Sequence, residues 1–345
     1  MKHFKYSFLI TIIALIAMGI LGYTQGGVSQ AVRLLSITTI LALMEISFSF
    51  DNAVVNASIL KTWNHYWQML FLTVGMIVAV FGMRLLFPIV IVSQTADMSL
   101  FDVWTMAINN PIEYSSKLQT HHGEISSFGG IFLLLVFLNF LIDNKKELHW
   151  FDWLEKELSD LGRIRTLPTL ISLLVLVVVL IFVKEGQEYP VLVAGIWGVI
   201  MFLGVKIVGE LLEQKHEASS DVVSAITKGG IGGFIYLEVL DASFSFDGVI
   251  GAFAITTDII TIMVGLGIGA FFVRSMTIYL VEKGTLDSYV YLEHGAHYAI
   301  GMLAVLMLIG ISYHHIPEIV TGLVGIAFII LSYFSSKKYK DNLSH

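Results

Sequence analysis

The sequence predicts an all-α fold, a polytopic bundle of about ten transmembrane helices, from its composition, its hydropathy pattern and an internal repeat. Of its 345 residues, 56% are hydrophobic and 14% are charged, and the mean hydropathy is +0.80. Soluble domains carry about 25% charged residues, so this chain is suited to lipid. Ten apolar stretches approach the roughly 20 residues that one crossing requires. They lie at about 7–23, 31–60, 66–92, 126–142, 167–184, 190–211, 226–256, 260–282, 297–313 and 316–335.

The composition also limits the chemistry. The absence of cysteine excludes disulfides, thiolate metal sites and thiol catalysis. A metal site must therefore use oxygen ligands, with imidazole as the other option, and oxygen ligands favour ions such as Mg, Ca or Mn. No polybasic run accompanies the net charge of −7, so nucleic acid is not an expected partner.

Lysine and arginine predict the orientation, because they are enriched in cytoplasmic loops. The first apolar stretch lacks a small-x-small cleavage site after it, so we expect a retained span and not a signal peptide. If the N-terminus lies in the cytoplasm, the cytoplasmic segments contain fourteen Lys and Arg residues. The segments on the outer side of the membrane then contain only Arg33, Lys117 and Lys184. We therefore expect a bacterial plasma (inner) membrane protein with both termini in the cytoplasm.

Two copies of one acidic motif divide the chain. SFSFDNAV at 47–54 matches SFSFDGVI at 243–250, and another acid precedes each motif aspartate by six residues. Downstream of each motif lies a Val-Gly pair, Val74-Gly75 or Val264-Gly265, and in both copies an arginine follows this pair at the same distance. These acids and arginines are Glu45, Asp51 and Arg84 in the first copy, and Asp241, Asp247 and Arg274 in the second.

The predicted topology makes the two copies antiparallel. Residues 1–142 form the first transmembrane repeat, 143–166 a cytoplasmic linker, and 167–345 the second, inverted repeat. Leucine and aromatic residues at helical spacing over 143–165 predict an amphipathic helix on the inner membrane face, with a partner-binding helix as the alternative. Inverted repeats are the architecture of alternating-access carriers, whose substrate site lies near mid-membrane where the halves meet.

Five acids fall within the apolar spans, and they indicate what such a site would bind. They are Glu45, Asp51, Glu238, Asp241 and Asp247. Neighbouring carboxylates in a low dielectric repel one another unless a proton or a cation joins them. Glu45 and Asp51 are about 600° apart on an ideal helix, so they converge only if the helix is broken between them. Asp51-Asn52 and Asp247-Gly248 use residue types that tolerate left-handed backbone, so we expect a broken helix at the acidic motif of each half. Further oxygen ligands could come from Ser47, Ser49, Ser243, Ser245, Asn52 and Asn56.

A structural alternative is that the acids only form buried ion pairs with Arg84 and Arg274. Two arginines do not neutralise five acids, so we expect them to act as partial counter-charges or gate residues. At the inner end of the ninth span, Glu293 and His297 share a helix face and predict either a vestibule ligand or a polar cap.

A predicted outer loop contains a second group of candidate metal ligands, His121, His122 and Glu124. A solvated loop that binds no metal explains these residues equally well.

Five stretches carry a resemblance to a known family: MEISFSFDNAVV (44–55), EVLDASFSFDGVIGAFAIT (238–256), YLEHGAHYAIG (291–301) and the two arginine-bearing spans. They resemble the TerC family of integral membrane proteins, and in particular a branch long catalogued as a domain of unknown function. The resemblance covers nearly the whole chain. It implies a LysE-like superfamily fold of inverted repeats and a role in metal-ion homeostasis, most often manganese efflux.

The resemblance also implies which residues form the metal site. The matching positions are Glu45, Asp51, Asn52, Glu238, Asp241 and Asp247. The first repeat departs from the second at one point, because Ala42 stands where a counterpart of Glu238 would be. The implied site is therefore asymmetric.

The leading functional hypothesis is a divalent-cation transporter with Mn(II) efflux first, Ca(II) second, proton exchange as a means of coupling, and no resident cofactor. The alternatives are an exporter of a cationic organic solute such as a basic amino acid, and an accessory factor that supplies metal to secreted enzymes. An aspartyl intramembrane protease would need Gly-x-Gly before one aspartate, whereas Ile268 follows the Gly-Leu-Gly of 265–267, so no enzyme is expected. The expected partners are the lipid bilayer and a metal ion, with a homo-oligomer left open.

Overall fold

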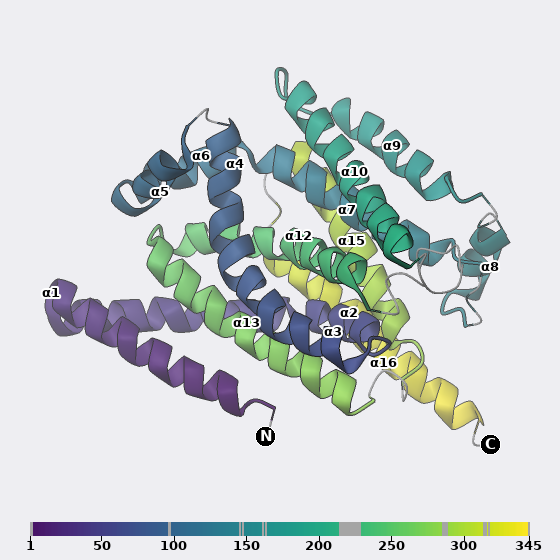
Figure 1. Ribbon diagram of the computed structural model, residues 1–345, viewed down its shortest axis with the longest axis horizontal. Coiled ribbons are helices and arrows are strands. Elements are labelled where there is room, and N and C mark those ends of the chain that lie inside the picture. The colour runs from purple at the N-terminus through teal and green to yellow at the C-terminus, as the bar shows by residue number, and fades with distance from the viewer. Residues whose placement is uncertain are drawn as a thin grey trace.

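The computed structural model describes residues 3–95, 98–144, 146, 148–160, 162, 164–213, 229–284, 289–312, 316 and 318–343. In that part of the chain every regular element is a helix and no strand occurs, which confirms the all-α prediction (Figure 1).

The first half contains α1 (Lys5–Phe48), α2 (Phe50–Leu60), α3 (His65–Leu70), the π-helices η1 (Phe71–Gly75) and η2 (Val78–Leu86), α4 (Phe87–Thr95), α5 (Leu100–Asn109), α6 (Pro111–Thr120) and α7 (His122–Leu141). After α8 (Asp152–Asp160), the second half contains α9 (Leu167–Leu180), α10 (Glu188–Glu213), α12 (Ile231–Ile255), α13 (Ile259–Glu282), α15 (Leu292–Ser312) and α16 (Glu318–Leu343).

Helix α1 is a helical hairpin, not one long rod (Figure 1). Gly26 and Gly27 leave helical geometry, and Gly27 adopts φ 69°, in the left-handed region that favours glycine. The two arms pack closely at Gly22: a Cβ added there would lie 2.6 Å from the Cα of Ala31 on the other arm. The hairpin therefore supplies the first predicted span and the start of the second, which continues into α2.

Seven helices in the described part are long and apolar enough to cross a membrane, with the α1 hairpin counted once. The protein is therefore a multi-pass membrane protein. Two more helices occupy predicted spans: α9, which is shorter at 14 residues, and α12, which carries the acids of the second motif. The number of ten crossings stays a prediction.

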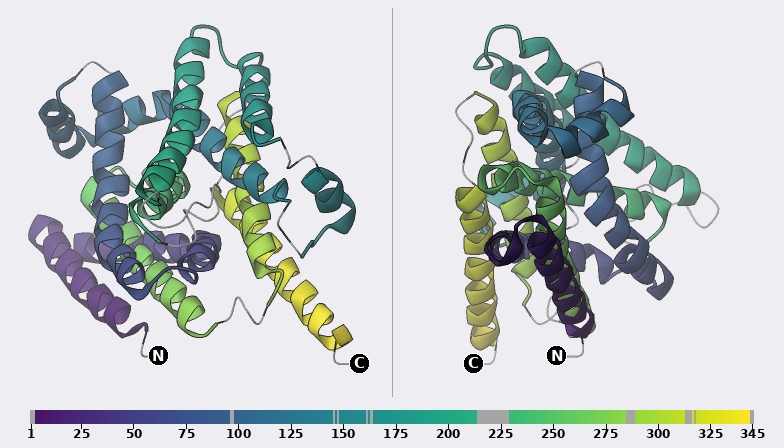
Figure 2. Two further views of the ribbon diagram at one scale, coloured as in Figure 1. Left: turned by 45° about the vertical axis from the view of Figure 1, so that its right-hand side comes forward. Right: turned by 90° about the vertical axis from the view of Figure 1, so that its left-hand side faces the viewer.

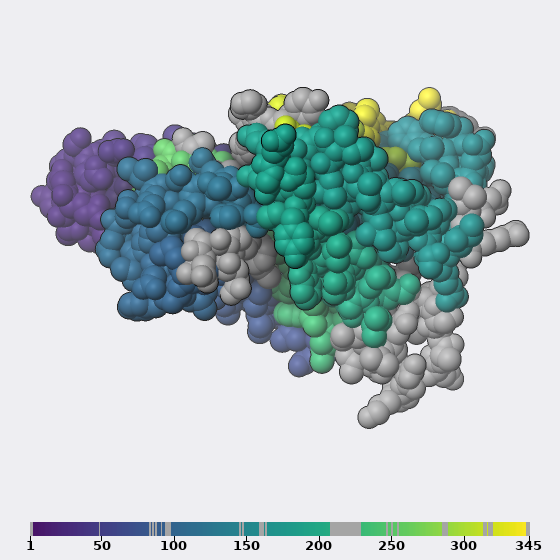
Figure 3. All heavy atoms as spheres, turned by 90° about the horizontal axis from the view of Figure 1, so that it is seen from above, coloured from purple at the N-terminus to yellow at the C-terminus, as the bar shows by residue number. Residues whose placement is uncertain are grey.

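The loops lie at opposite ends of the bundle. In Figure 1 the turn of the α1 hairpin lies at the left edge, α5–α6 at the upper left and the α9–α10 loop at the top, whereas α8 lies at the right. Figure 2 shows the start of α1 and the end of α16 toward the lower edge of the molecule in both views. In the space-filling view of Figure 3, the α1 hairpin forms one end of the molecule, beside α5 and α6.

Helices of the two halves pack against each other in the centre. α1 and α2 pack along α13, α12 packs against η2, and α7 packs along α15. The segments that carry both acidic motifs and both predicted arginines therefore lie in the interior. The division into two inverted repeats stays a prediction.

The linker helix is shorter than the predicted 143–165, because a carboxylate folds the chain just before α8. Glu155 accepts hydrogen bonds from the backbone N–H groups of Trp150, at 3.2 Å, and Phe151, at 3.3 Å. The rings of Trp150 and Phe151 then pack on Tyr298 of α15, with centroids 5.7 and 5.1 Å apart. Part of the apolar side that we expected on the membrane thus contacts the bundle.

Glu155 is also the centre of a buried polar cluster that the sequence analysis missed. Its carboxylate is 0% exposed and lies 2.7 Å from Lys146 Nζ, 3.0 Å from the Tyr298 hydroxyl and 3.6 Å from His294 Nε2. Burial by itself raises the pKa of a carboxyl group, but the hydrogen bond and charge of Lys146 hold the pKa of Glu155 below its usual 4.5. The cluster joins two segments that are remote in sequence, Lys146 and Glu155 from the linker and His294 and Tyr298 from α15, so it depends on how these segments pack.

Replacing this carboxylate, Glu155→Gln, should destabilise the protein by about 3 kcal/mol, because the buried Lys146 ammonium loses its partner. The folded pKa is depressed, so the stability that Glu155 supplies is present above pH 4.5 and is lost as the pH falls through the folded value. Thermal unfolding in detergent from neutral to acidic pH measures both effects. The exposed Glu157→Gln on the same helix is the control; equal stability of wild type and Glu155→Gln at neutral pH would contradict the prediction.

Candidate functional site

The first acidic motif lies at a break between two helices. α1 ends just before Ser49, which forms a bend with φ −97° and ψ 19°, and α2 begins just after it. The break separates Glu45 from Asp51, as predicted. Asp51 falls in the first turn of α2, where the helix dipole stabilises a carboxylate, and the Asn52 N–H donates to its Oδ1 at 2.9 Å.

The second acidic motif does not repeat this break. α12 runs as one helix through Asp241 and Asp247, which corrects the expectation of a broken helix in both halves. At the bend, the Ser49 hydroxyl donates to the Glu45 carboxylate at 2.9 Å, whereas the corresponding Ser245 hydroxyl is buried without a hydrogen-bond partner. The serine–carboxylate bond thus accompanies the break in the first half. The side chain of Asp247 lies outside the described part.

A buried ion pair joins Glu45 to Arg84. Arg84 Nη2 lies 2.5 Å from Glu45 Oε1, and both side chains are 5% exposed. Arg84 lies on η2, and its Nη1 donates to the carbonyl of Ala79 at 2.8 Å. Two glycines leave room for the Glu45 side chain. A Cβ added at Gly269 would lie 2.4 Å from Cβ and Cγ of Glu45, and a Cβ added at Gly248 would lie 3.2 Å from its Oε2.

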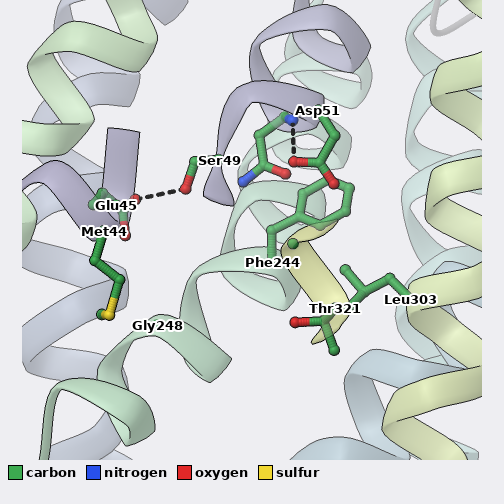
Figure 4. A pocket seen from close by; sticks show the side chains of 10 residues that line it. Met44, Glu45, Ser49, Asp51, Phe244, Gly248, Leu303 and Thr321 are labelled. Carbon is green, nitrogen blue, oxygen red and sulfur yellow. Dashed lines mark hydrogen bonds between the residues drawn. The ribbon is translucent and has the colours of Figure 1, made fainter. Parts of the chain in front are cut away.

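Two small cavities flank this pair. The first, of about 40 Å³, has the polar lining residues Glu45, Ser49, Asp51, Asn52 and Thr321. The second, of about 30 Å³, has the polar lining residues Glu45, Ser49, Asn52, Asn56, Arg84, Asp241, Arg274 and Thr277. Figure 4 shows the first cavity, with Glu45 hydrogen-bonded to Ser49 and with Asp51 on the other side of Ser49, near Phe244. Cavities of this size hold a few waters or an ion.

In the second cavity, Asp241 interacts with Asn56. Asn56 Nδ2 donates to Asp241 Oδ1 at 3.4 Å, while the buried Asn56 Oδ1 has no hydrogen-bond partner. Asp241 also interacts electrostatically with Arg84 and Glu45. The cavity therefore combines two acids, two arginines and an amide oxygen without a hydrogen-bond partner.

Glu238 and Arg274 lie close to this cavity. Both carboxylate oxygens of Glu238 are buried without a hydrogen-bond partner, and a Cβ at Gly75 would lie 2.4 Å from Oε1. An unpartnered buried carboxylate is unfavourable when ionised, so a proton or a cation is needed to balance its charge. Arg274 lines the cavity, but its Nε donates to the backbone carbonyl of Leu72 and not to an acid.

The predicted metal-site residues are thus distributed, not gathered into one cage. Among the described residues, no three His, Asp or Glu side chains lie close enough together to hold a metal ion. Asp51 lines the first cavity, Asp241 the second, and Glu45 and Asn52 line both.

The two serines that were expected to support the site bond to their own helices. Ser47 is exposed and donates to the Leu43 carbonyl at 2.7 Å, and Ser243 donates to the Val239 carbonyl at 2.9 Å. Neither serine lines the two cavities, so this expectation is corrected. Their hydroxyl groups satisfy a backbone carbonyl one turn back, as is common for serine in apolar helices.

The two side chains of the predicted vestibule pair on α15 make different contacts. Glu293 pairs with Lys61 at 3.3 Å, whereas His297 Nδ1 hydrogen-bonds the backbone carbonyl of Glu293 at 2.9 Å. The His297 ring stacks on Phe140 with centroids 3.8 Å apart. The carboxylate and the imidazole therefore have different partners.

The predicted outer-loop residues lie where α6 meets α7, with His122 and Glu124 in the first turn of α7. His121 and Glu124 contact each other at 2.8 Å, and His122 lies 3.4 Å from the Ser126 hydroxyl. All three side chains are partly buried in a helical segment, so the expectation of a solvated loop is wrong.

Two glycines, Gly325 of α16 and Gly269 of α13, were not identified from the sequence, although they allow these helices to approach the buried acids closely. A Cβ at Gly325 would lie 2.7 Å from Asp51 Oδ2, so α16 approaches this carboxylate closely, as Gly269 of α13 allows for Glu45. The chain contains 30 glycines, and no local pattern distinguishes these from the others.

Together these features define a class: a multi-pass helical membrane protein with buried carboxylates lining small cavities inside the bundle. The chain belongs to the family described as "Protein of unknown function (DUF475)", whose model matches residues 50–342. The matched range includes Asp51, Arg84 and Asp241 and begins after Glu45. No curated protein and no solved structure matches the chain.

Replacing Gly269→Ala should destabilise the protein by about 1–3 kcal/mol, because the new methyl group overlaps the Glu45 side chain in a packed interior. The matched control is Gly204→Ala on α10, where an added Cβ has no atom within 4 Å and should be neutral or slightly stabilising. Thermal unfolding in detergent compares the two. Equal unfolding temperatures would contradict the packing described for Glu45.

Proposed function

We propose that this protein is a divalent-cation transporter that exports Mn(II), with Ca(II) as the second candidate ion. The observation that carries the proposal is the pair of adjacent cavities inside the bundle, lined by carboxylate, amide and hydroxyl oxygens. Such ligands suit hard divalent cations. The resemblance to the TerC family supports the same ion class.

Unpartnered oxygens near the second cavity add to the case. Asn56 Oδ1 and both oxygens of Glu238 are buried without a hydrogen-bond partner. In a low-dielectric interior such groups are costly until they bind a proton or a cation. Alternate binding of a proton and a metal ion at these groups would couple export to proton entry.

The size of the cavities favours an ion over an organic solute. Their volumes are about 40 and 30 Å³, whereas pockets for small organic molecules are typically about 300–1,000 Å³. A basic amino acid would therefore need a large rearrangement before it could enter.

The proposed setting is the plasma membrane of a bacterium, with both termini in the cytoplasm. The excess of Lys and Arg in the segments assigned to the inside supports this orientation. The start of α1 and the end of α16 lie toward the same edge of the molecule, which supports an even number of crossings.

Asp51→Asn should reduce Mn(II) flux into liposomes by at least about 10-fold, because it removes a charged oxygen ligand while preserving the shape of the side chain. The control is Asp102→Asn, the same change at an exposed position on α5. Flux is followed with a Mn(II)-quenched dye inside the vesicles. Flux of Asp51→Asn at the wild-type rate would refute the proposal.

A strain that lacks the gene should accumulate manganese and grow poorly in excess manganese, because export is lost. Cellular metal content and growth curves measure this, with complementation by the wild-type gene as the control. Unchanged manganese content and growth would argue against Mn(II) export.

A further inference from the structure

The two cavities share one wall. Three residues line both of them, Glu45, Ser49 and Asn52, while Asp51 lines only the first and Asp241 only the second. Glu45 is therefore the carboxylate common to both cavities.

The two oxygens of Glu45 have different surroundings. Oε1 accepts hydrogen bonds from Arg84, which lines the second cavity, and from Ser49. Oε2 lies next to Gly248, which lines the first cavity. One carboxylate thus faces both cavities, and its Oε1 is neutralised by a guanidinium group.

We infer that Arg84 competes with the transported cation for Glu45 and thereby controls passage between the two cavities; this inference rests on the proposed function. A cation in the first cavity meets Asp51 and Glu45 Oε2. To reach Asp241 and Asn56 Oδ1 in the second cavity, it must pass Glu45 and displace Arg84 from Oε1.

The surroundings of Arg84 suit such a displacement. It interacts electrostatically with Asp241 as well as with Glu45, so a second carboxylate is available when the first is taken by a cation. Its Nε is buried without a hydrogen-bond partner, so the guanidinium is not fully held in its present position. The transported cation and the Arg84 guanidinium repel each other when both lie at Glu45, so binding of the ion and release of Arg84 are coupled.

This competition has a measurable consequence. A bound ion must leave again, and a carrier that binds its ion too tightly is slow. Arg84 lowers the affinity at Glu45, because part of the binding free energy of the ion is used to displace the guanidinium. Removing Arg84 should therefore tighten binding and slow transport.

The experiment measures Mn(II) binding to the purified full-length protein in detergent by electron paramagnetic resonance, and Mn(II) flux in liposomes. Arg84→Gln should lower the Kd for Mn(II) by about 10-fold or more and should lower the maximal flux. Arg33→Gln, the same change at an exposed position on α1, should alter neither.

Arg274→Gln separates competition from a general loss of positive charge. Arg274 lines the second cavity but donates to a backbone carbonyl, so removing it does not free Glu45. Its effect on the Kd should be much smaller than that of Arg84→Gln. Equal tightening by the two variants would overturn the inference, as would unchanged or weaker binding by Arg84→Gln.

Arg84→Lys tests the same point if Arg84→Gln does not fold. Lysine keeps the charge but lacks the planar fork that reaches both Glu45 and Ala79, so it should compete less well and lower the Kd by a smaller factor. An unchanged or higher Kd would overturn the inference.

Wild type and Asp51→Asn show which proposal has failed. If wild type binds Mn(II), Asp51→Asn does not, and Arg84→Gln binds no tighter, only the competition is refuted. If wild type binds neither Mn(II) nor Ca(II), the proposed function fails and the competition fails with it.

Discussion

Glu45 and Arg84 form a buried ion pair inside the bundle, where each charge alone would be strongly unfavourable. The residues around the two side chains hold them in contact. The helix bends at Ser49, whose hydroxyl adds a hydrogen bond to the carboxylate. Gly248 and Gly269 bring α12 and α13 close to the same side chain. This pair therefore fixes how helices of the two halves meet.

The two acidic motifs show how similar sequences acquire different roles in one bundle. The first motif contains a helix break and an acid paired with Arg84, whereas the second lies on the continuous α12. The corresponding arginine, Arg274, donates to a backbone carbonyl. Arg84 lies on a π-helix and Arg274 on a regular α-helix.

Several features followed from local patterns. Hydropathy located the long apolar helices, although it missed α5 and α6 in the predicted outer loop. The six-residue spacing of Glu45 and Asp51 predicted a break, which the bend at Ser49 confirms. Other expectations failed because they depended on neighbours in space. Ser47 was expected at the site and is exposed, and the linker helix was shortened by the buried Glu155. Neither outcome can be inferred from spacing, because each depends on which helix packs beside the residue.

The amino-acid sequence alone determined that the chain is helical and membrane-embedded. This is because the length of each apolar stretch and the distribution of Lys and Arg beside it are local properties, and they govern insertion into a bilayer. It also determined that acids and arginines are placed within the spans. Tertiary structure decided which of them meet: that Glu45 pairs with Arg84, that Asp51 and Asp241 line separate cavities, and that Glu238 has no hydrogen-bond partner. These outcomes depend on distances of a few ångströms between helices that are remote in sequence, and packing alone fixes such distances.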